Sequence, residues 1–584
     1  MPTFPGSREK EYAITGTQKV DAHIKCADMI IGAVSAKARN TTLSTAPQDT
    51  MKTDTIFPLP RDIVSPVNRL RLSNLLSSHP DQELVHYIND GFRDGFDIMY
   101  CGNISSTLPK NLKSAMQYEQ KVTAAITKEL QRGHTSGPFE LSPFSITHCS
   151  PLGAVEIQDS SVRIILDLSQ PRGASVNESI IDDYCSVHYT SFDEAVRLVK
   201  TQGAKAFMAK VDIRHAFRLC PVRRADWPLL CYFWKGKYYV DTRLPFGARS
   251  SPAIFNTFAD VLTWILSYHG EIDFIVHYLD DFLICAPDKE TCTSWLCTFQ
   301  DIMKYLGVPV AHDKTVPPSS VLVFLGIEID VQHQMIRLPN DKLNCLLSTL
   351  NAWSNRKKCT KRELLSLVGS LAFASKVVKS GRTFVRRLID LAYSVSRLGH
   401  HISLNRNARA DIQWWIDFLP SWNGIELIQH DLRTSSDLSL FTDASDIGMG
   451  GVFDDKWFST TWPLHFSGDN CSTNFQELFA IFTAITIWAD MLSNKQILIH
   501  CDNQTIVSVI NAGTCKSSTT IMTVIRKLFF VCARHNISIL AKHIPGHFND
   551  QADALSRLQV ARFNHLHPTA AKNPTSVPAT IWNI

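Results

Sequence analysis

The fold is decided by residues 274–285, which read FIVHYLDDFLIC. Two short apolar runs, Phe274–His277 and Phe282–Cys285, flank the tetrapeptide Tyr278-Leu279-Asp280-Asp281. Apolar runs of this length around a polar break predict two strands joined by a tight turn. The carboxylates of Asp280 and Asp281 are then expected at the tip of a hairpin, where functional side chains often gather.

The residues before this hairpin predict further short strands and one long helix. Runs rich in strand-forming residues cover 162–168 and 207–213, and a third run, 229–240, folds back at Lys235-Gly236-Lys237. A helix over Pro252–Leu266 follows the turn Pro245-Phe246-Gly247. Strands and helices mixed in this way predict a chain of the α+β or α/β class.

Asp212 closes the run 207–213, so a third carboxylate is also expected at a strand end. Three such carboxylates suggest a two-metal site, in which one cation lowers the pKa of the attacking hydroxyl and the other stabilises the leaving pyrophosphate. Hard oxygen ligands suit Mg²⁺, with two ions in a site, and Mn²⁺ equally. Taken alone, however, Asp280-Asp281 is more often a solvated turn, so these residues alone leave both readings open.

An ordered set of motifs favours the metal site. It consists of Asp212-Ile213-Arg214-His215-Ala216-Phe217, the segment LPFGARSSPAIFN at 244–256, the hairpin at 278–281, and Phe324-Leu325-Gly326-Ile327 after Lys314. In this order the motifs resemble those of reverse transcriptases from retroelements. The resemblance implies a right-hand polymerase with fingers, palm and thumb, in which Asp212, Asp280 and Asp281 are the catalytic, metal-binding carboxylates.

The same resemblance implies residues that contact the incoming deoxynucleoside triphosphate. Phe217 is read as the steric gate that leaves no room for a 2′-hydroxyl, and Arg163, on the predicted strand 162–168, as the arginine that grips the triphosphate. Phe246 and Gly247 are placed beside the nucleotide, and Lys314 is read as the group that protonates pyrophosphate. Related viral enzymes have a lysine shortly before the arginine, whereas the stretch Val155 to Val162 contains none. An ordinary core Phe and a solvated Arg are the plain alternatives.

A second, independent set of four carboxylates follows. Asp443 ends the strand-like run Leu438–Thr442, Glu477 lies early in a helical pattern, Asp502 follows the run 496–500, and Asp553 lies in the last helical pattern. Four carboxylates at such element ends can hold two magnesium ions for in-line hydrolysis. The order resembles that of the RNase H fold.

The RNase H resemblance has three open points at the level of single residues. It implies that His543 assists water activation or product release, although a generic loop histidine is the alternative. Asp550 competes with Asp553 for the fourth position, and the residues that follow Asp553 favour Asp553. Gly448, Gly450 and Gly451 are expected to permit a close strand turn and to bring the backbone near a substrate's minor groove.

A basic segment lies between the two carboxylate sets. It contains Arg356, Lys357, Lys358, Lys361 and Arg362, within a region from Lys342 to about Leu398 that the pattern predicts to be all-helical. A charge run of this kind is usually a solvated face. Its position favours contact with the phosphates of a nucleic-acid duplex, which would release counterions and make the affinity fall steeply with salt.

Length and composition fit a large multidomain protein. The 584 residues carry a formal net charge of only +4, so nucleic-acid affinity must come from local clusters. Fifteen cysteines without a CxxC pair indicate reduced thiols and no zinc site, and no signal peptide or membrane span is recognised. We expect a location in the cytoplasm or nucleus and no secretion. The expected divisions are a disordered extension (1–63), a helical region (64–135), fingers and palm (136–332), a basic helical thumb or connection (333–430), an RNase H-like domain (431–560) and a linker (561–584).

Three further segments refine the resemblance within retroelements. They are Leu166 to Asn177, His79-Pro80-Asp81 with Gly91-Phe92, and Lys361 to Gly369, and they look like DIRS-type, tyrosine-recombinase retrotransposons. The function implied is an RNA-directed DNA polymerase with RNase H activity. Its partners would be an RNA template, a DNA primer, an RNA–DNA hybrid and deoxynucleoside triphosphates. The alternative is a degenerate or co-opted retroelement protein that binds nucleic acid without catalysis.

Overall fold

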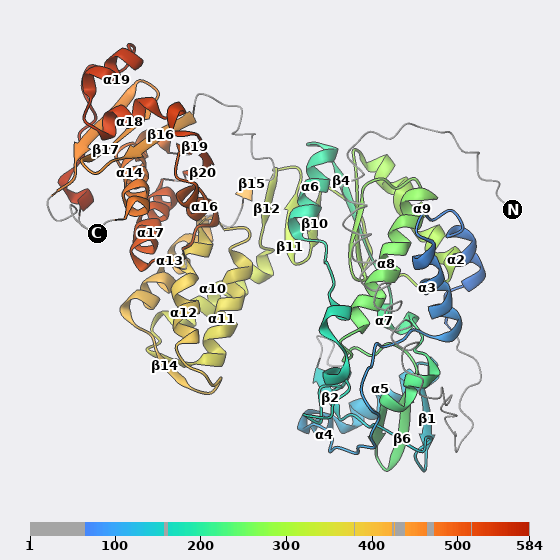
Figure 1. Ribbon diagram of the computed structural model, residues 1–584. Helices are drawn as coiled ribbons and strands as arrows, with labels where there is room; N and C mark the ends of the chain where they lie inside the picture. Colours follow the sequence, from blue (N-terminus) through green and yellow to red (C-terminus); the bar gives the residue numbers. More distant parts are fainter. Residues whose placement is uncertain are drawn as a thin grey trace, which may run out of the picture. The chain divides into compact units, whose positions relative to one another are not determined.

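The computed structural model describes residues 65–156, 162–378, 380–422, 425–426, 438–463, 472–493, 495–515, 517–535 and 537–582. The chain divides into two compact units, Met1–Phe324 and Leu325–Ile584 (Figure 1). The expected extension 1–63 and the expected boundary at 431 lie outside the described residues. The helical segment 333–430, expected as a domain of its own, belongs to the same compact unit as the residues that follow it.

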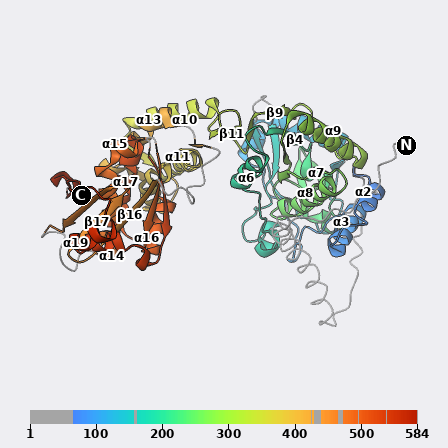
Figure 2. The same ribbon diagram turned by 90° about the horizontal axis from the view of Figure 1, so that it is seen from above.

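A four-stranded antiparallel sheet forms the centre of the first unit. Its order is β7-β8-β4-β9, with β7 at Ile275–Tyr278, β8 at Asp281–Ala286, β4 at Phe207–Asp212 and β9 at Val316–Ser319. Residues 282–286 of β8 are all buried, because helices cover both faces of the sheet. Helices α8 (Ser251–Tyr268) and α9 (Lys289–Leu306) lie on one side, and α6 (Phe192–Gln202) lies on the other (Figures 1 and 2). The predicted strands and the predicted helix 252–266 are confirmed to within two residues.

The rest of the first unit consists of helices and two small sheets. Helix α3 (Gln82–Asp94) begins at the N-cap Asp81, and α2 (Arg69–Leu75) precedes it. Helix α5 (Glu119–Gln131) packs against β3 (Val162–Leu166), which pairs with β2 (Leu152–Glu156). The other sheet has the order β1-β6-β5, with β1 at Thr135–Phe139, β5 at Cys231–Trp234 and β6 at Lys237–Asp241. The predicted fold-back at 235–237 is confirmed, since Lys235 (φ 49°) and Gly236 (φ 78°) form the left-handed turn between β5 and β6.

The second unit begins with strands β11 (Ile327–Asp330) and β12 (Met335–Arg337), and a bundle of four helices follows. The helices are α10 (Asn340–Ser354), α11 (Lys361–Ala374), α12 (Arg386–Tyr393) and α13 (Arg406–Trp422). The expectation of an all-helical region is wrong at one place. Lys358–Thr360 form strand β13, which pairs with β14 (His401–Ser403) because Cys359 and Ile402 are buried together.

A five-stranded mixed sheet forms the rest of the second unit. Its order is β18-β17-β16-β19-β20; β16 runs parallel to β19, β19 parallel to β20, and β17 is antiparallel to both neighbours. The strands are β16 (Ser439–Ala444), β17 (Gly448–Phe453), β18 (Lys456–Thr461), β19 (Gln496–Cys501) and β20 (Ser538–His543). The predicted strands near 438–442 and 496–500 are confirmed.

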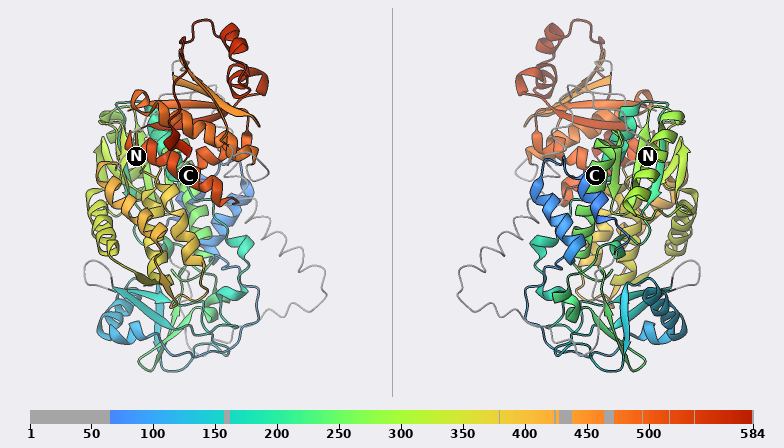
Figure 3. Two further views of the ribbon diagram at one scale, coloured as in Figure 1. Left: turned by 90° about the vertical axis from the view of Figure 1, so that its left-hand side faces the viewer. Right: turned by 90° about the vertical axis from the view of Figure 1, so that its right-hand side faces the viewer.

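Helices α14 (Thr473–Ile487) and α18 (Asp550–Ser556) pack on opposite faces of this sheet (Figure 3). Met449 of β17 accepts a hydrogen bond from Thr483 of α14, whereas the adjacent Gly450 lies against Leu555 of α18. Successive residues of a strand point to opposite faces, so the two helices must lie on opposite sides. Helix α17 (Thr519–Arg534) packs beside α14, and α16 (Gln504–Ala512) packs on β20.

The residues after 560 are packed on the second unit, so the expectation of a linker there is wrong as a description of structure. Phe563 of α19 (Val560–Leu566) is fully buried against Trp457, at a ring distance of 5.2 Å. The Trp457 Nε1 donates a hydrogen bond to the carbonyl of Ala571, and Trp582 stacks on Phe479. Apolar burial and paired polar groups hold this segment, whose composition alone suggested a solvated chain.

Among the described helices, none is long and apolar enough to cross a membrane. The thirteen cysteines of the described residues are free thiols.

Candidate active sites

The first site is built by strand ends in the first unit. Asp212, the last residue of β4, is the direct cross-strand partner of Asp281, the first residue of β8. Asp280 lies in the two-residue turn between β7 and β8, and its carbonyl accepts a hydrogen bond from the amide of Ile213 at 2.9 Å. Leu279, the other turn residue, has φ 53°, a left-handed conformation that is costly for a residue with a side chain. The hairpin therefore brings together the three predicted carboxylates.

Two lysines pair with two of the three carboxylates. The Nζ of Lys314 donates to Asp212 Oδ2 at 3.0 Å, and the Nζ of Lys210 lies 3.1 Å from Asp281 Oδ1. Burial raises the pKa of Asp280, and the neighbouring Asp212 and Asp281 raise it further. Sequence reasoning missed Lys210, although its position two residues before Asp212 on β4 places both side chains on one face.

The predicted gate Phe217 lies just beyond β4, in the short helix α7 (Ala216–Leu219), and is half-buried. Its ring contacts Phe255 at 5.6 Å and Phe246 at 5.3 Å. Phe246 is 49% exposed, and the guanidinium of Arg163 lies over its ring at 5.4 Å. The structure therefore joins Arg163, Phe246 and Phe217 in one row that ends next to strand β4.

Gly247 has a packing role in this row. A Cβ atom at this position would lie 2.0 Å from the carbonyl oxygen of Leu166, so only glycine allows the loop to approach β3. Asn177 holds the loop, because its Nδ2 donates to the Gly247 carbonyl and its Oδ1 accepts from the Arg249 amide, both at 2.9 Å. This close approach leaves Phe246 exposed to solvent. The contribution of Gly247 is therefore to let the loop lie against β3.

The second site lies at the β16–β19 ends of the five-stranded sheet. Asp443 is on β16, Glu477 is on α14, and Asp502 directly follows β19. Ligand atoms of Glu477, Cys501 and Asp502 lie within 4.8 Å of one another. Among the described residues, the Glu477 Oε2 is buried and has no hydrogen-bond partner. A buried carboxylate oxygen of this kind is costly unless a cation or proton satisfies it.

Burial and mutual repulsion make these carboxyl groups poor acids. Burial raises the pKa of Glu477 to about 9, with further increases from Asp443 and Asp502. Burial likewise raises the pKa of Asp443 to about 6, and the charges of Asp502 and Asp553 add to the increase. A divalent cation would remove this repulsion, so the donor set fits a metal site.

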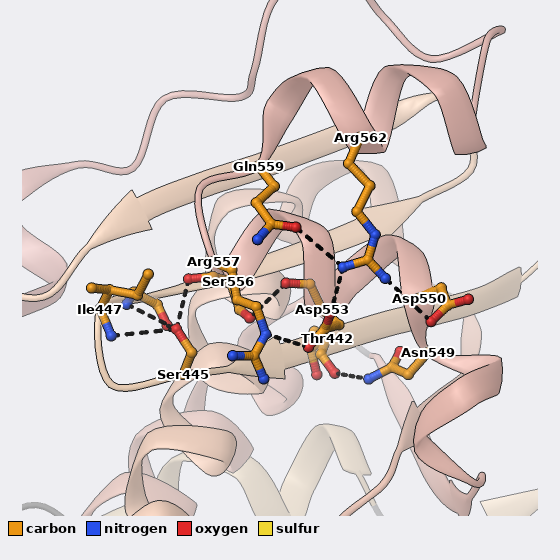
Figure 4. A network of polar contacts seen from close by, with 11 residues as sticks. Thr442, Ser445, Ile447, Asn549, Asp550, Asp553, Ser556, Arg557, Gln559 and Arg562 are labelled. Carbon is orange, nitrogen blue, oxygen red and sulfur yellow. Dashed lines mark hydrogen bonds and ion pairs between the residues drawn. The ribbon is translucent and has the colours of Figure 1, made fainter.

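Asp553 joins this cluster from α18, and two arginines hold it (Figure 4). Arg557 Nε donates to its Oδ1 at 2.7 Å, and Arg562 Nη1 donates to its Oδ2 at 3.0 Å. Asp550 is exposed and lies 3.6 Å from Arg562. The charge of Asp553, unlike that of Asp550, is among those that raise the pKa of Asp443. Of the two aspartates, Asp553 is therefore the one that the structure brings to Asp443. Arg562 lies on α19, a helix that was not predicted from the sequence, so the contact between Arg562 and Asp553 could not be predicted either.

His543 and Asn549 border the second site. The ring Nε2 of His543, at the end of β20, lies 3.1 Å from the carbonyl oxygen of Asp502, and the side chain is exposed. Asn549 is buried, and its Nδ2 donates to the carbonyl of Thr442 at 3.0 Å (Figure 4). This bond ties the start of α18 to β16, next to Asp443.

The expectation that Gly448, Gly450 and Gly451 bring the backbone near a minor groove is wrong. All residues of β17 are buried. A Cβ atom at Gly450 would lie 2.3 Å from the Cβ of Leu555, and one at Gly448 would lie 2.4 Å from the carbonyl of Thr460. The glycines make room for α18 and for the neighbouring strand β18.

The basic segment divides into exposed and internally bonded residues. Lys357, Lys358 and Arg362 are exposed. Arg356 pairs with Glu363 and lies over the ring of Trp353 at 4.9 Å. The expectation is wrong for Lys361, which is buried and donates from Nζ to the carbonyl of Val395 at 2.7 Å. Lys361 is the first residue of α11, and its ammonium group donates to backbone carbonyls of the segment that follows α12. Its charge is therefore not available to a phosphate.

Comparison with known proteins identifies the class of one segment of the chain. Residues 165–329 match the family model described as "Reverse transcriptase (RNA-dependent DNA polymerase)", and this range contains Asp212, Asp280 and Asp281. The chain therefore contains a reverse transcriptase domain.

The relatives place this domain among retroelements. The chain is 23% identical over 454 residues to the Transposon Tf2-3 polyprotein of Schizosaccharomyces pombe, covering 74% of this chain and 30% of that protein. It is 21% identical over 384 residues to Polyprotein P3 of Commelina yellow mottle virus, covering 62% and 19%. The chain thus spans less than a third of the length of these relatives, and its reverse transcriptase is of retroelement origin.

Solved structures with a similar course of the chain include two of a foamy viral protease-reverse transcriptase. One is a complex with double-stranded DNA, at 15% identity, 84% coverage of both chains and a TM-score of 0.47. The other is a complex with an RNA/DNA hybrid, at 15% identity, 83% and 64% coverage and a TM-score of 0.47.

Proposed function

We propose that the chain is an RNA-directed DNA polymerase that also carries an RNase H-type hydrolytic site. The observation that carries the proposal is the meeting of Asp212, Asp280 and Asp281 at the β4 end and the β7–β8 turn. These residues lie within the reverse transcriptase domain. The substrates are a primed RNA template and deoxynucleoside triphosphates.

The side chains around the first site support nucleotidyl transfer. Bound Mg²⁺ or Mn²⁺ would supply the charge that lowers the pKa of the primer 3′-hydroxyl and stabilises pyrophosphate, with the three aspartates as its ligands. Phe217 closes the space beneath the sugar, and Arg163 binds phosphate oxygens through its planar fork. Lys314 is largely exposed, and Asp212 raises its pKa, so it stays protonated and can neutralise the leaving pyrophosphate.

The second site supports hydrolysis of the RNA strand of a hybrid. The arguments for it are the strand order β18-β17-β16-β19-β20, the four clustered carboxylates and the unsatisfied Glu477 oxygen. Asp443, Glu477, Asp502 and Asp553 would hold the divalent cations that activate water and stabilise the leaving oxygen. Each Asp553 oxygen accepts one arginine hydrogen bond and keeps a lone pair that a cation could use.

The test separates the two sites with one variant each. Primer extension on an RNA template and cleavage of a preformed RNA–DNA hybrid are measured with magnesium for wild type, Asp280→Asn and Asp443→Asn. We expect Asp280→Asn to lose extension and keep cleavage, and Asp443→Asn to do the reverse. Each loss should exceed about a hundredfold, since each aspartate is a direct metal ligand in the proposal.

The opposite results are equally informative. If the folded, monodisperse wild type shows neither activity but binds the hybrid, the chain is a degenerate or co-opted retroelement protein without catalysis. If both activities disappear in either variant alone, the assignment of two independent sites is wrong.

The narrower lineage that we propose is the DIRS-like, tyrosine-recombinase group of retrotransposons. The support is the three sequence segments at 166–177, 79–92 and 361–369. Sequencing the flanking genomic locus tests it, because a neighbouring tyrosine recombinase frame is expected and an integrase frame with long terminal repeats would contradict it. A location in the cytoplasm or nucleus is part of the proposal, and imaging of a tagged chain checks it.

A further inference from the structure

A cavity of about 470 Å³ lies on the first unit between α5, β3 and the loop at 245–246. Its walls include Lys128 of α5, the C-cap residue Arg132, Arg163 of β3, His215 and Phe246. The volume is within the range of pockets that hold small molecules the size of a nucleotide.

Helix α5 presents one continuous face to this cavity. The lining residues recur at intervals of three or four positions along the helix and its C-cap, and they are Lys121, Ala124, Ala125, Lys128, Glu129 and the C-cap Arg132. Residues at this spacing lie above one another on one side of a helix. The two alanines leave open space between α5 and β3, and the lysines and the arginine border that space.

The positive charge of the cavity is only partly neutralised. The acidic lining residues are Glu129 and Asp241, and both are already paired with Arg218, at 3.3 Å and 2.7 Å. Glu129 also pairs with Arg132, and Lys121 pairs with Glu156 at 2.9 Å. Within the described residues, Lys128 and Arg163 have no acidic partner, so two uncompensated cations border the same space.

The position of the cavity indicates which anion these cations meet. Phe246 lines the cavity and contacts Phe217, the proposed gate beneath the sugar of the incoming nucleotide. His215 lines it as well and lies two residues before Phe217. Burial and the neighbouring Arg132 and His134 lower the pKa of His215, which leaves the uncompensated charge to the lysine and the arginine. A polyphosphate attached to a nucleotide at Phe217 would extend into this space.

We propose that Lys128 of α5 is the second cation of the triphosphate grip and acts with Arg163 from the other wall of the cavity. The proposal rests on the polymerase function proposed above and adds a substrate-binding residue to it. It also accounts for the stretch Val155 to Val162, which offers no lysine for this purpose.

The test measures the dissociation constant of a deoxynucleoside triphosphate from the enzyme–primer–template complex by single-turnover incorporation. We expect Lys128→Met to raise this constant about tenfold to hundredfold, the effect of removing one charge-assisted hydrogen bond, and Lys128→Arg to restore most of the affinity. The matched control is Lys121→Met on the same helix face, which should change it less than about threefold because Glu156 already holds that ammonium group.

Further measurements separate the alternatives. The affinity for the primer–template should stay unchanged in Lys128→Met; if it falls together with the nucleotide affinity, α5 holds the template strand and the proposal is overturned. An unchanged nucleotide constant in a variant of wild-type thermal stability also overturns it, while the polymerase function stands. A wild type that does not extend primers overturns both.

Discussion

At the scale of single residues, the two carboxylate clusters differ in how their charge is balanced. Lysines pair with Asp212 and Asp281 in the first site, whereas in the second site Glu477 has an unsatisfied oxygen and a pKa of about 9. Two of the three carboxylates in the first cluster are therefore paired with a cation before any metal ion binds. In the second cluster, the raised pKa of Glu477 favours its protonated form, and two arginines pair with Asp553.

The first prediction concerns Phe217, the proposed steric gate. Phe217 packs between Phe246 and Phe255 and is only half-buried, so a smaller side chain opens space without emptying the core. Phe217→Val should lower the preference for deoxynucleotides over ribonucleotides by at least about tenfold, the scale of one steric contact in specificity. The measurement is the ratio of kcat/KM for the two triphosphates in primer extension. Unchanged discrimination in an active variant removes Phe217 from this role.

Some site residues could be predicted from sequence and others could not. The carboxylates could be predicted, because Asp-Asp between two apolar segments and Asp after a strand-forming segment are local patterns. Such patterns place the side chain at a strand end whatever the rest of the chain does. Lys210 and the cavity face of α5 could also be predicted. Lys210 lies two residues before Asp212 on a strand, and the cavity-lining residues of α5 recur every three or four positions, so both follow from the sequence spacing. Arg562 could not be predicted, because its contact with Asp553 depends on the docking of α19 through Phe563.

At the scale of elements, close packing of α18 on β17 sets the position of Asp553. Gly450→Ala would put a Cβ atom 2.3 Å from that of Leu555, so α18 must shift. We expect this variant to lose hybrid cleavage by at least about tenfold, since misplacement of a catalytic group by about 1 Å can cost a hundredfold. Primer extension should be retained.

A matched glycine provides the control for that prediction. A Cβ atom at Gly369, inside α11, meets no atom within 4 Å, and Gly369→Ala should stabilise the protein by about 0.5–1 kcal/mol. Thermal unfolding monitored by circular dichroism checks both variants. Equal cleavage by Gly450→Ala and wild type would show that α18 tolerates displacement.

The ionic contact between the helix bundle and α17 gives a pH prediction. Asp411 of α13 is buried and lies 3.2 Å from Arg526 of α17 and 3.4 Å from Arg387 of α12. Burial raises its pKa to about 6 despite both guanidinium groups. The folded state therefore binds the proton more tightly than the unfolded state, and the free energy of unfolding falls as pH rises from about 4 through about 6.

The test compares wild type with Asp411→Asn across this pH range. Relative to the variant, the wild type should lose at most about 3 kcal/mol between about pH 4 and about pH 7, because the amide does not titrate. Asp417→Asn, at an exposed position on the same helix, serves as the control and should follow the wild type. A wild type that gains stability relative to Asp411→Asn with rising pH would show that the ion pairs dominate.

Secondary structure was predictable where a short segment of strand-forming residues is followed or preceded directly by polar turn residues, as at β7, β8 and β16. Strand β13 was not, because Lys358–Thr360 become a strand only by pairing with residues 401–403, about forty positions later in the chain. The same non-local dependence explains Lys361, whose neighbours in sequence are exposed charges while its own ammonium group binds carbonyls of residues 395 and 396.

At the scale of the whole molecule, a net charge of +4 leaves nucleic-acid binding to local clusters. Lys357, Lys358 and Arg362 form such a cluster, since they are exposed, unlike Lys361. Replacing all three by Ala should reduce the slope of log K against log salt for hybrid binding by up to about 2.7, because each phosphate that is no longer neutralised lowers the slope by about 0.9. Fluorescence anisotropy at several salt concentrations measures the slope.

The control for this experiment removes charge elsewhere. Lys289 and Lys304 are exposed on α9 of the first unit, and the double Ala variant should leave the slope within about 0.5 of wild type. If the triple variant at 357, 358 and 362 behaves like this control, the segment is a solvated face.

The lysine partners of the first carboxylate cluster affect the stability of the site when no metal ion is bound. Because Lys314 and Lys210 already lie beside Asp212 and Asp281, the protein carries its own counterions at the tip of the hairpin. The two ammonium groups reduce the repulsion among the three aspartates when the metal leaves, so the turn at Leu279 can keep its shape. The polymerase should therefore survive storage in a chelator and regain full activity as soon as magnesium returns, with no slow recovery phase.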